Sequence, residues 1–125
     1  MIVAPQLLLD RIRDEWIQLF EVDMRPYSAV YWELLMHLWA EGGRARKTDA
    51  LRSIKSIRNP HTAGKYVEIA VRKGMLEERK NPKDARSRLL MLTPQTKMRM
   101  GAFLDWAMDE LRRSSDAIHR KALRA

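Results

Sequence analysis

The side chains best suited to specific chemistry lie in one short segment near the middle of the chain. Asn59, His61, Thr62 and Lys65 are polar, and Gly64 stands among them. On the first turns of a helix, short polar side chains can hydrogen-bond to base edges in a nucleic-acid groove. Gly64 allows close approach of the backbone, at a cost of up to about 1 kcal/mol in helix propensity. This segment therefore favours recognition of a nucleic-acid surface.

Residues that would support catalysis or metal binding have no suitable arrangement. The chain has no cysteine, which excludes disulfides, thiolate metal sites and cysteine nucleophiles. The three histidines, His37, His61 and His119, lack metal-ligand spacing. Asp109 and Glu110 are neighbours on an expected helix and do not face one shared site. We therefore expect no enzyme activity, no catalytic residue, no cofactor and no metal.

The charge distribution indicates the kind of partner. The 125 residues carry 24 Lys and Arg against 16 Asp and Glu, a net charge of +8. Residues 1–43 have a net charge of −4, whereas residues 44–88 carry fourteen basic and five acidic side chains. So dense a positive charge attracts polyanions, because each neutralised phosphate releases condensed counterions. A charge excess that only improves solubility is the alternative.

Three helices are expected to frame the basic segment. Apolar residues recur at helical spacing over residues 5–21 and again over 26–41, with a break at 24–26 between them. Two glycines, Gly42-Gly43, end the second helix. Residues 94–123 form a long amphipathic helix that starts at a proline. Such a helix extends about 45 Å, more than a small domain covers, so we expect the terminal helices to form a homodimer.

Between these helices, the pattern predicts a helix-turn-helix followed by a hairpin. A short basic helix has Thr48 as its N-cap, and a second helix begins at Asn59-Pro60 and ends at Gly74. Two helices separated by a short turn are typical of DNA-binding proteins whose second helix enters the major groove. Two short strands, residues 75–80 and 88–93, then enclose a polar loop at 81–87.

The chain is predicted to be a single cytoplasmic domain over residues 1–125. It contains no linker, low-complexity tract or repeat, and its length is that of one domain. No apolar run approaches the roughly 20 residues that span a bilayer. The first residues lack the basic start of a secretory signal.

The segment from Thr48 to Thr93 resembles the winged-helix core of the MarR family of bacterial transcription regulators. The resemblance lies in the cap, threonine and basic residue of Asn59–Lys65, in Gly74–Arg79, and in Asn81–Arg86 followed by Leu92-Thr93. The order of the helices outside this core is also similar to that of the family. The resemblance implies a mainly α fold with a small β-hairpin. Its winged helix-turn-helix core would span residues 44–93, flanked by dimerisation helices at 1–25 and 94–125.

The motif and the resemblance together assign candidate DNA contacts. Those of the recognition helix are Asn59, His61, Thr62, Gly64 and Lys65. In the wing, the resemblance places Arg86 in the minor groove, with Lys83 nearby and Asp84 bracing Arg86 as an ion pair. Cations around the first helix of the motif would hold phosphates, which set register and affinity. These are Arg44, Arg46, Lys47, Arg52, Lys55 and Arg58.

We therefore expect a homodimeric, sequence-specific regulator that binds double-stranded DNA in the bacterial nucleoid. Two other interpretations stay open: an architectural, nucleoid-associated winged-helix protein that binds DNA without sequence choice, and a protein–protein interaction module. A small-molecule effector also stays open, because members of the family that this chain resembles often bind one. Trp and Met at helical spacing are, however, more typical of cores and interfaces than of ligand pockets.

Overall fold

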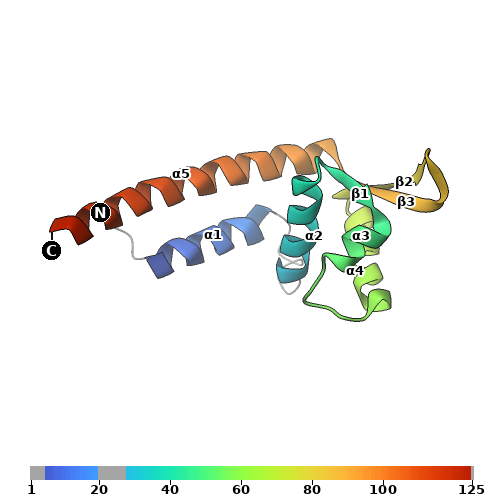
Figure 1. Ribbon diagram of the computed structural model, residues 1–125, viewed down its shortest axis with the longest axis horizontal. Helices are drawn as coiled ribbons and strands as arrows, with labels where there is room; N and C mark the ends of the chain where they lie inside the picture. Colours follow the sequence, from blue (N-terminus) through green and yellow to red (C-terminus); the bar gives the residue numbers. More distant parts are fainter. Residues whose placement is uncertain (1–4, 20–27, 125) are drawn as a thin grey trace. The chain divides into compact units, whose positions relative to one another are not determined.

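The computed structural model describes residues 5–19 and 28–124 (Figure 1). They form two compact units. The helical unit comprises residues 5–19 and 99–124, and the winged unit comprises residues 28–98. The predicted break at 24–26, and the predicted start of the second helix at residue 26, lie outside the described residues. Across the two described stretches, no helix has the length and hydropathy needed to span a membrane.

Two helices that are far apart in the sequence pack together in the helical unit. α1 (Pro5–Leu19) lies beside α5 (Pro94–Arg124), whose first turn belongs to the winged unit. The rings of Trp16 and Phe103 meet edge-on, with 5.3 Å between their centroids. The guanidinium of Arg11 lies 5.8 Å from the ring centroid of Trp106 and 3.7 Å from a carboxylate oxygen of Glu110. Aromatic packing with a charged rim therefore joins α1 to α5.

The winged unit combines three helices with a small antiparallel sheet. α2 (Ser28–Ala40) is followed by β1 (Arg44–Arg46), α3 (Lys47–Arg52) and α4 (Pro60–Arg72). β2 (Leu76–Asn81) and β3 (Asp84–Leu92) form a hairpin, and β1 pairs with the other edge of β3. The tip of the hairpin extends away from the helices (Figure 1). The mainly α, winged helix-turn-helix fold is therefore confirmed.

The core of the winged unit draws on its three helices and on the hairpin. Each of these helices and both strands of the hairpin supply apolar side chains that are no more than 1% exposed. Burial of a large apolar side chain stabilises a fold by roughly 1.5–3 kcal/mol. The largest contributions come from Tyr31, Leu34, Leu35 and Leu38 of α2, Val67 of α4, Leu76 of β2 and Leu90 of β3.

Most of the residues predicted to begin or end a helix do so in the structure. Gly42, Gly43 and Gly74 have φ angles of 83°, 99° and 76°, and they follow the ends of α2 and α4. The side chain of Asn59 accepts a hydrogen bond of 2.9 Å from the backbone N–H of His61, and a proline occupies the first position of α4. These predictions are confirmed because they depend on local backbone geometry.

Predictions that involve pairing with β3 were less accurate. β1 is a third strand where only a hairpin was expected. Because β1 holds Arg46 in an extended conformation, α3 begins at Lys47, and the prediction that Thr48 is the N-cap is wrong. The predicted loop at 81–87 is also too long, since β3 already begins at Asp84. Strand pairing depends on partners distant in the sequence, which local propensity does not encode.

Gly43 links α2 to the sheet and provides a test of stability. Its N–H donates to the carbonyl of Leu38 and its carbonyl accepts from the N–H of Leu92, both at 2.8 Å. A side chain at its φ of +99° would be strained. We expect Gly43→Ala to lower the free energy of unfolding by about 1–2 kcal/mol in urea denaturation.

Gly64→Ala is the matched control for this substitution. An added Cβ at Gly64 meets no atom within 4 Å, and the residue lies inside α4. It should therefore raise the free energy of unfolding by up to about 1 kcal/mol. Changes of the same sign in the two variants would contradict the assigned roles of these glycines.

Candidate nucleic-acid interface

The N-terminal half of α4 is polar on the outside and anchored on the inside. Ala63, Val67 and Ala70 are no more than 1% exposed and fix the inner face of the helix in the core. The five predicted recognition residues flank or oppose that buried face. Asn59, His61 and Lys65 are exposed, and Thr62 and Gly64 are half-buried. The exposed side chains of His61 and Lys65 lie opposite the buried face, with the half-buried Thr62 and Gly64 on its two flanks.

Two side chains of α2 hold α4 and the turn before it. The hydroxyl of Tyr31 donates to the backbone carbonyl of Tyr66 at 2.9 Å, and the two rings meet edge-on at 6.3 Å. The carboxylate of Glu33 accepts from the backbone N–H groups of Lys55 at 2.8 Å and of Ser56 at 3.0 Å. It also accepts from the hydroxyl of Ser56. α2 therefore serves as the support for the helix-turn-helix.

Glu33 stays ionised more readily than an ordinary glutamate. Burial by itself raises its pKa, but the hydrogen bonds from Ser56 and Lys55 together bring the pKa below the usual value of 4.5. Sequence reasoning missed this residue. A signal was present, because Glu33 is the only Asp, Glu, Lys or Arg in the otherwise apolar sequence of α2.

The wing is organised by side-chain to backbone hydrogen bonds. The side-chain oxygen of Asn81 accepts from the N–H of Lys83, and its amide donates to the hydroxyl of Ser87. Asp84 accepts a hydrogen bond of 3.0 Å from the backbone N–H of Arg86. The predicted ion pair between Asp84 and Arg86 is therefore corrected, since Asp84 shapes the backbone instead. Lys83, Asp84 and Arg86 are all exposed.

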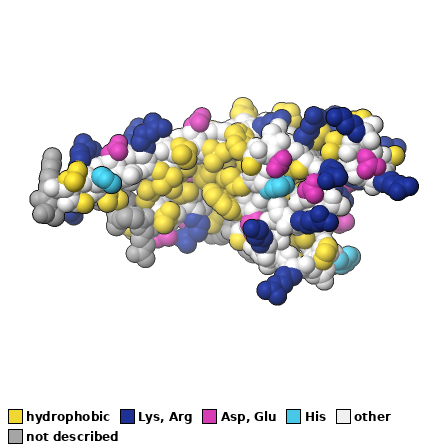
Figure 2. Space-filling view, in the orientation of Figure 1, with side chains coloured by type: hydrophobic (Ala, Val, Ile, Leu, Met, Phe, Trp, Pro, Cys, Tyr) yellow, Lys and Arg dark blue, Asp and Glu magenta, His cyan; other side chains and the backbone are white. Residues whose placement is uncertain are grey.

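The predicted phosphate-binding cations fall into two groups. Arg46 pairs with Asp49 at 3.2 Å, and Lys47 pairs with Glu78 at 2.5 Å. The others are exposed and form no ion pair with any residue that the structure describes: Arg44, Arg52, Lys55 and Arg58. On the face shown in Figure 2, Lys and Arg side chains are spread widely over the winged unit. The second group is the better placed to neutralise phosphates.

Glu78 is the centre of a small ion-pair network below the wing. Its carboxylate contacts Lys47 at the start of α3 and Arg88 on β3, the latter at 3.5 Å. The hydrogen bond from Lys47 is the main reason that the pKa of Glu78 lies below its usual value, and Arg88 adds to the effect. The network therefore ties α3 to the hairpin.

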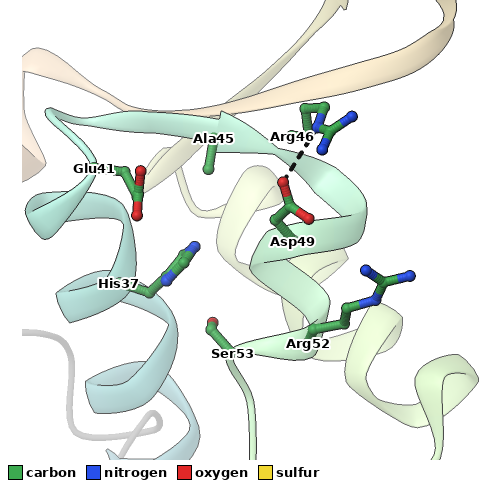
Figure 3. Close-up of a pocket in the computed structure, with 7 residues that line it drawn as sticks. All are labelled: His37, Glu41, Ala45, Arg46, Asp49, Arg52 and Ser53. Carbon is green, nitrogen blue, oxygen red and sulfur yellow. Dashed lines mark hydrogen bonds and ion pairs between the residues drawn. The ribbon is translucent and has the colours of Figure 1, made fainter.

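A hollow of about 490 Å³ lies between α2, β1 and α3 (Figure 3). It is lined by His37, Glu41, Ala45, Arg46, Asp49, Arg52 and Ser53. A dashed line in Figure 3 marks the ion pair between Arg46 and Asp49, two of the residues that line the hollow. Because cations and carboxylates are mixed here, the hollow favours no single ligand charge. Among residues 5–19 and 28–124, no group of three or more metal-ligating side chains gathers at one place.

The chain is similar to known proteins in its three-dimensional structure. The sequence matches no protein-family model and no curated protein. Among solved structures, AbsC, a MarR family transcriptional regulator from Streptomyces coelicolor, is 18% identical with a TM-score of 0.57. That match covers 90% of this chain and 76% of AbsC.

Two further structures have the same fold. A mutant of MarR from E. coli, solved in complex with operator DNA, is 16% identical with a TM-score of 0.55, covering 90% of this chain and 80% of that one. BpsR from Bordetella bronchiseptica, whose DNA binding is regulated by 6-hydroxynicotinic acid, is 17% identical with a TM-score of 0.55. It matches 87% of this chain and 79% of its own. The chain therefore has the winged-helix fold of MarR-type regulators, as the resemblance in its sequence implied.

The Glu78 network makes part of the stability dependent on pH. Because the folded pKa is depressed, ionised Glu78 stabilises the fold above its unfolded pKa, and this contribution is lost as pH falls through the folded pKa. We expect Glu78→Gln to flatten the decline in unfolding free energy below about pH 4.5, measured by urea denaturation at several pH values. Glu77→Gln on the same strand is the control. An unchanged slope in Glu78→Gln would contradict the network.

Proposed function

We propose that this chain is a MarR-family transcription regulator that binds specific sequences of double-stranded DNA as a homodimer. The observation that carries the proposal is the polar N-terminal half of α4, exposed on one side and anchored on the other by buried alanines and valine. A rigid helix with short polar side chains and a glycine fits the floor of the major groove. The complex of the E. coli MarR mutant with operator DNA, formed by a protein of the same fold, supports DNA binding.

Each protomer would place residues 59–73 in the major groove. Thr62 and Lys65 would contact base edges, and Gly64 would let the backbone approach closely. The exposed Arg86 of the wing would reach the adjacent minor groove, where narrow A·T tracts concentrate negative potential. Lys83 lies at the tip of the hairpin and would contact the backbone there.

The exposed cations that form no ion pair with a described residue would hold the phosphates. Arg44, Arg52, Lys55 and Arg58 are exposed around α3 and the turn that follows it. Such contacts set the register of the protein on DNA and supply affinity without sequence preference. With six to ten phosphate contacts per complex, affinity should fall by about 10³ or more between 50 and 200 mM salt.

The helical unit would provide the dimer interface. Large apolar side chains are exposed on both of its helices: Leu7, Leu9, Met108, Leu111 and Leu123. Hydrophobic side chains cover a broad area over α1 and α5 in Figure 2. A two-fold symmetric dimer would read a pseudo-palindrome with half-sites about one helical turn apart. In this proposal the whole chain acts as one DNA-binding module in the bacterial cytoplasm, without catalysis; an effector stays a prediction.

A random-duplex selection tests the proposed function directly. The protein is incubated at about 150 mM salt, near physiological screening, and the retained DNA is sequenced. We expect a two-fold symmetric consensus. Retention without enrichment would contradict sequence-specific regulation and favour an architectural role. Failure to retain any duplex would contradict DNA binding and favour a protein–protein interaction module.

A pair of substitutions tests the division between base and phosphate contacts. Lys65→Ala should weaken binding to the selected duplex by about 1–3 kcal/mol and relax base preference at one position. Arg58→Ala should weaken selected and random duplexes in the same ratio and lower the salt slope by about 1. Fluorescence anisotropy at several salt concentrations measures both. If the two variants change specific and random binding alike, the assigned roles are wrong.

A further inference from the structure

The turn between α3 and α4 is held by a single carboxylate. Residues 53–59 connect the two helices, and Ile54 is buried at their start while Asn59 caps α4 at their end. Between those two residues, the backbone N–H groups that find an acceptor in the described chain are those of Lys55 and Ser56. Both use Glu33, which also accepts from the Ser56 hydroxyl.

Glu33 and Tyr31 together fix α4 at two separate points. Tyr31 binds the backbone of Tyr66 in the middle of α4, and Glu33 binds the segment that leads into its first turn. The buried face of α4 holds the helix against the core, and these two contacts add polar restraints at its middle and just before its start. The N-terminal end of α4, which carries the polar recognition residues, is the end that Glu33 controls.

The charge of Glu33 acts against general DNA affinity. The carboxylate lies in contact with a turn that carries the exposed cations Lys55 and Arg58, and like charge repels phosphates. An uncharged residue at this position would favour binding to DNA of any sequence. Specificity is a difference between the affinities for two DNA sequences. A group that weakens binding to all DNA but aligns α4 therefore increases the ratio of specific to random affinity.

We propose that Glu33 is a positioning residue that determines sequence specificity, aligning the start of α4 through the backbone of Lys55 and Ser56. The inference rests on the proposed function, since it concerns how the same helix reads DNA. In this proposal Glu33 itself would touch no base. Its effect is expected in the ratio of specific to random binding rather than in the affinity for DNA as such.

Glu33→Gln tests the proposal with little change in side-chain size. An amide has one acceptor oxygen, and its NH2 group would face one of the two backbone N–H donors, so the paired hydrogen bonds cannot both form. We expect the affinity for the selected duplex to fall about tenfold, comparable to the effect of one mismatched base pair. The affinity for a random duplex of the same length should stay equal or rise.

Glu41→Gln is the matched control. It removes the same charge directly after α2, from an exposed side chain with no hydrogen bond or ion pair to the described residues. It should change specific and random affinities in the same ratio. Ser56→Ala removes one of the three hydrogen bonds without changing the charge, and we expect a smaller loss of the specificity ratio in the same direction.

Amide hydrogen exchange by NMR provides a readout that is independent of DNA. The N–H groups of Lys55 and Ser56 should be protected in the wild-type protein and exchange faster in Glu33→Gln, while the amides of the α2 core keep their protection. Fast exchange at both positions in the wild type would overturn the proposal. A uniform loss of protection would also overturn it, because Glu33 would then support the fold as a whole.

The binding outcomes are equally decisive. An unchanged specificity ratio in a folded Glu33→Gln variant overturns the inference and leaves the proposed function intact. A wild-type protein that binds selected and random duplexes equally overturns the proposed function, and the role of Glu33 in specificity with it. The inference about Glu33 is supported if the ratio of specific to random affinity falls in Glu33→Gln and Ser56→Ala and stays unchanged in Glu41→Gln.

Discussion

α4 can present side chains to a groove only if the rest of the protein fixes its backbone from the other side. The buried face formed by Ala63, Val67 and Ala70 anchors the helix in the core, but the hydrophobic effect that drives this burial is itself non-directional. The hydrogen bond that Tyr31 donates and those that Glu33 accepts are directional. The geometry of the proposed reading surface therefore depends on α2, a helix that contributes no side chain to it.

The positively charged side chains of the winged unit fall into two groups. Some cations serve the fold: Lys47 and Arg88 meet at Glu78, and Arg46 is paired with Asp49. Others, such as Arg44, Arg52 and Arg58, form no ion pair among the described residues and remain open to a polyanion. The net charge therefore overstates how much positive charge is available to bind phosphates, because cations already paired with carboxylates contribute less to phosphate binding.

Several features were predictable because their causes are local. Asn59 followed by Pro60 marks a helix start, since the side chain caps a free N–H and proline needs none. Gly43 and Gly74 end helices at positive φ, a conformation that glycine adopts at little cost. The apolar periodicity of α2 and α5 likewise indicated their extent, because each helix must bury one face.

Other features were not accessible to sequence reasoning. β1 is three residues long, and it exists because Ala45 pairs with Leu90 across the sheet. Thr48 looked like an N-cap, but that pairing keeps the chain extended until Lys47 and moves the start of α3. Asp84 and Arg86 suggested an ion pair, yet the tight turn places the carboxylate against a backbone N–H. In each case a partner distant in sequence, or a turn geometry, decided the outcome.

The sequence by itself determined the class of fold, the order of its helices and the segment that carries the candidate recognition residues. Helix periodicity, caps and glycine turns act over a few residues, so their information lies in neighbouring positions. Only the tertiary structure decided which cations form ion pairs and what holds α4 in place. Glu33 meets Lys55 and Ser56 across more than twenty residues of chain, and no local rule relates positions so far apart.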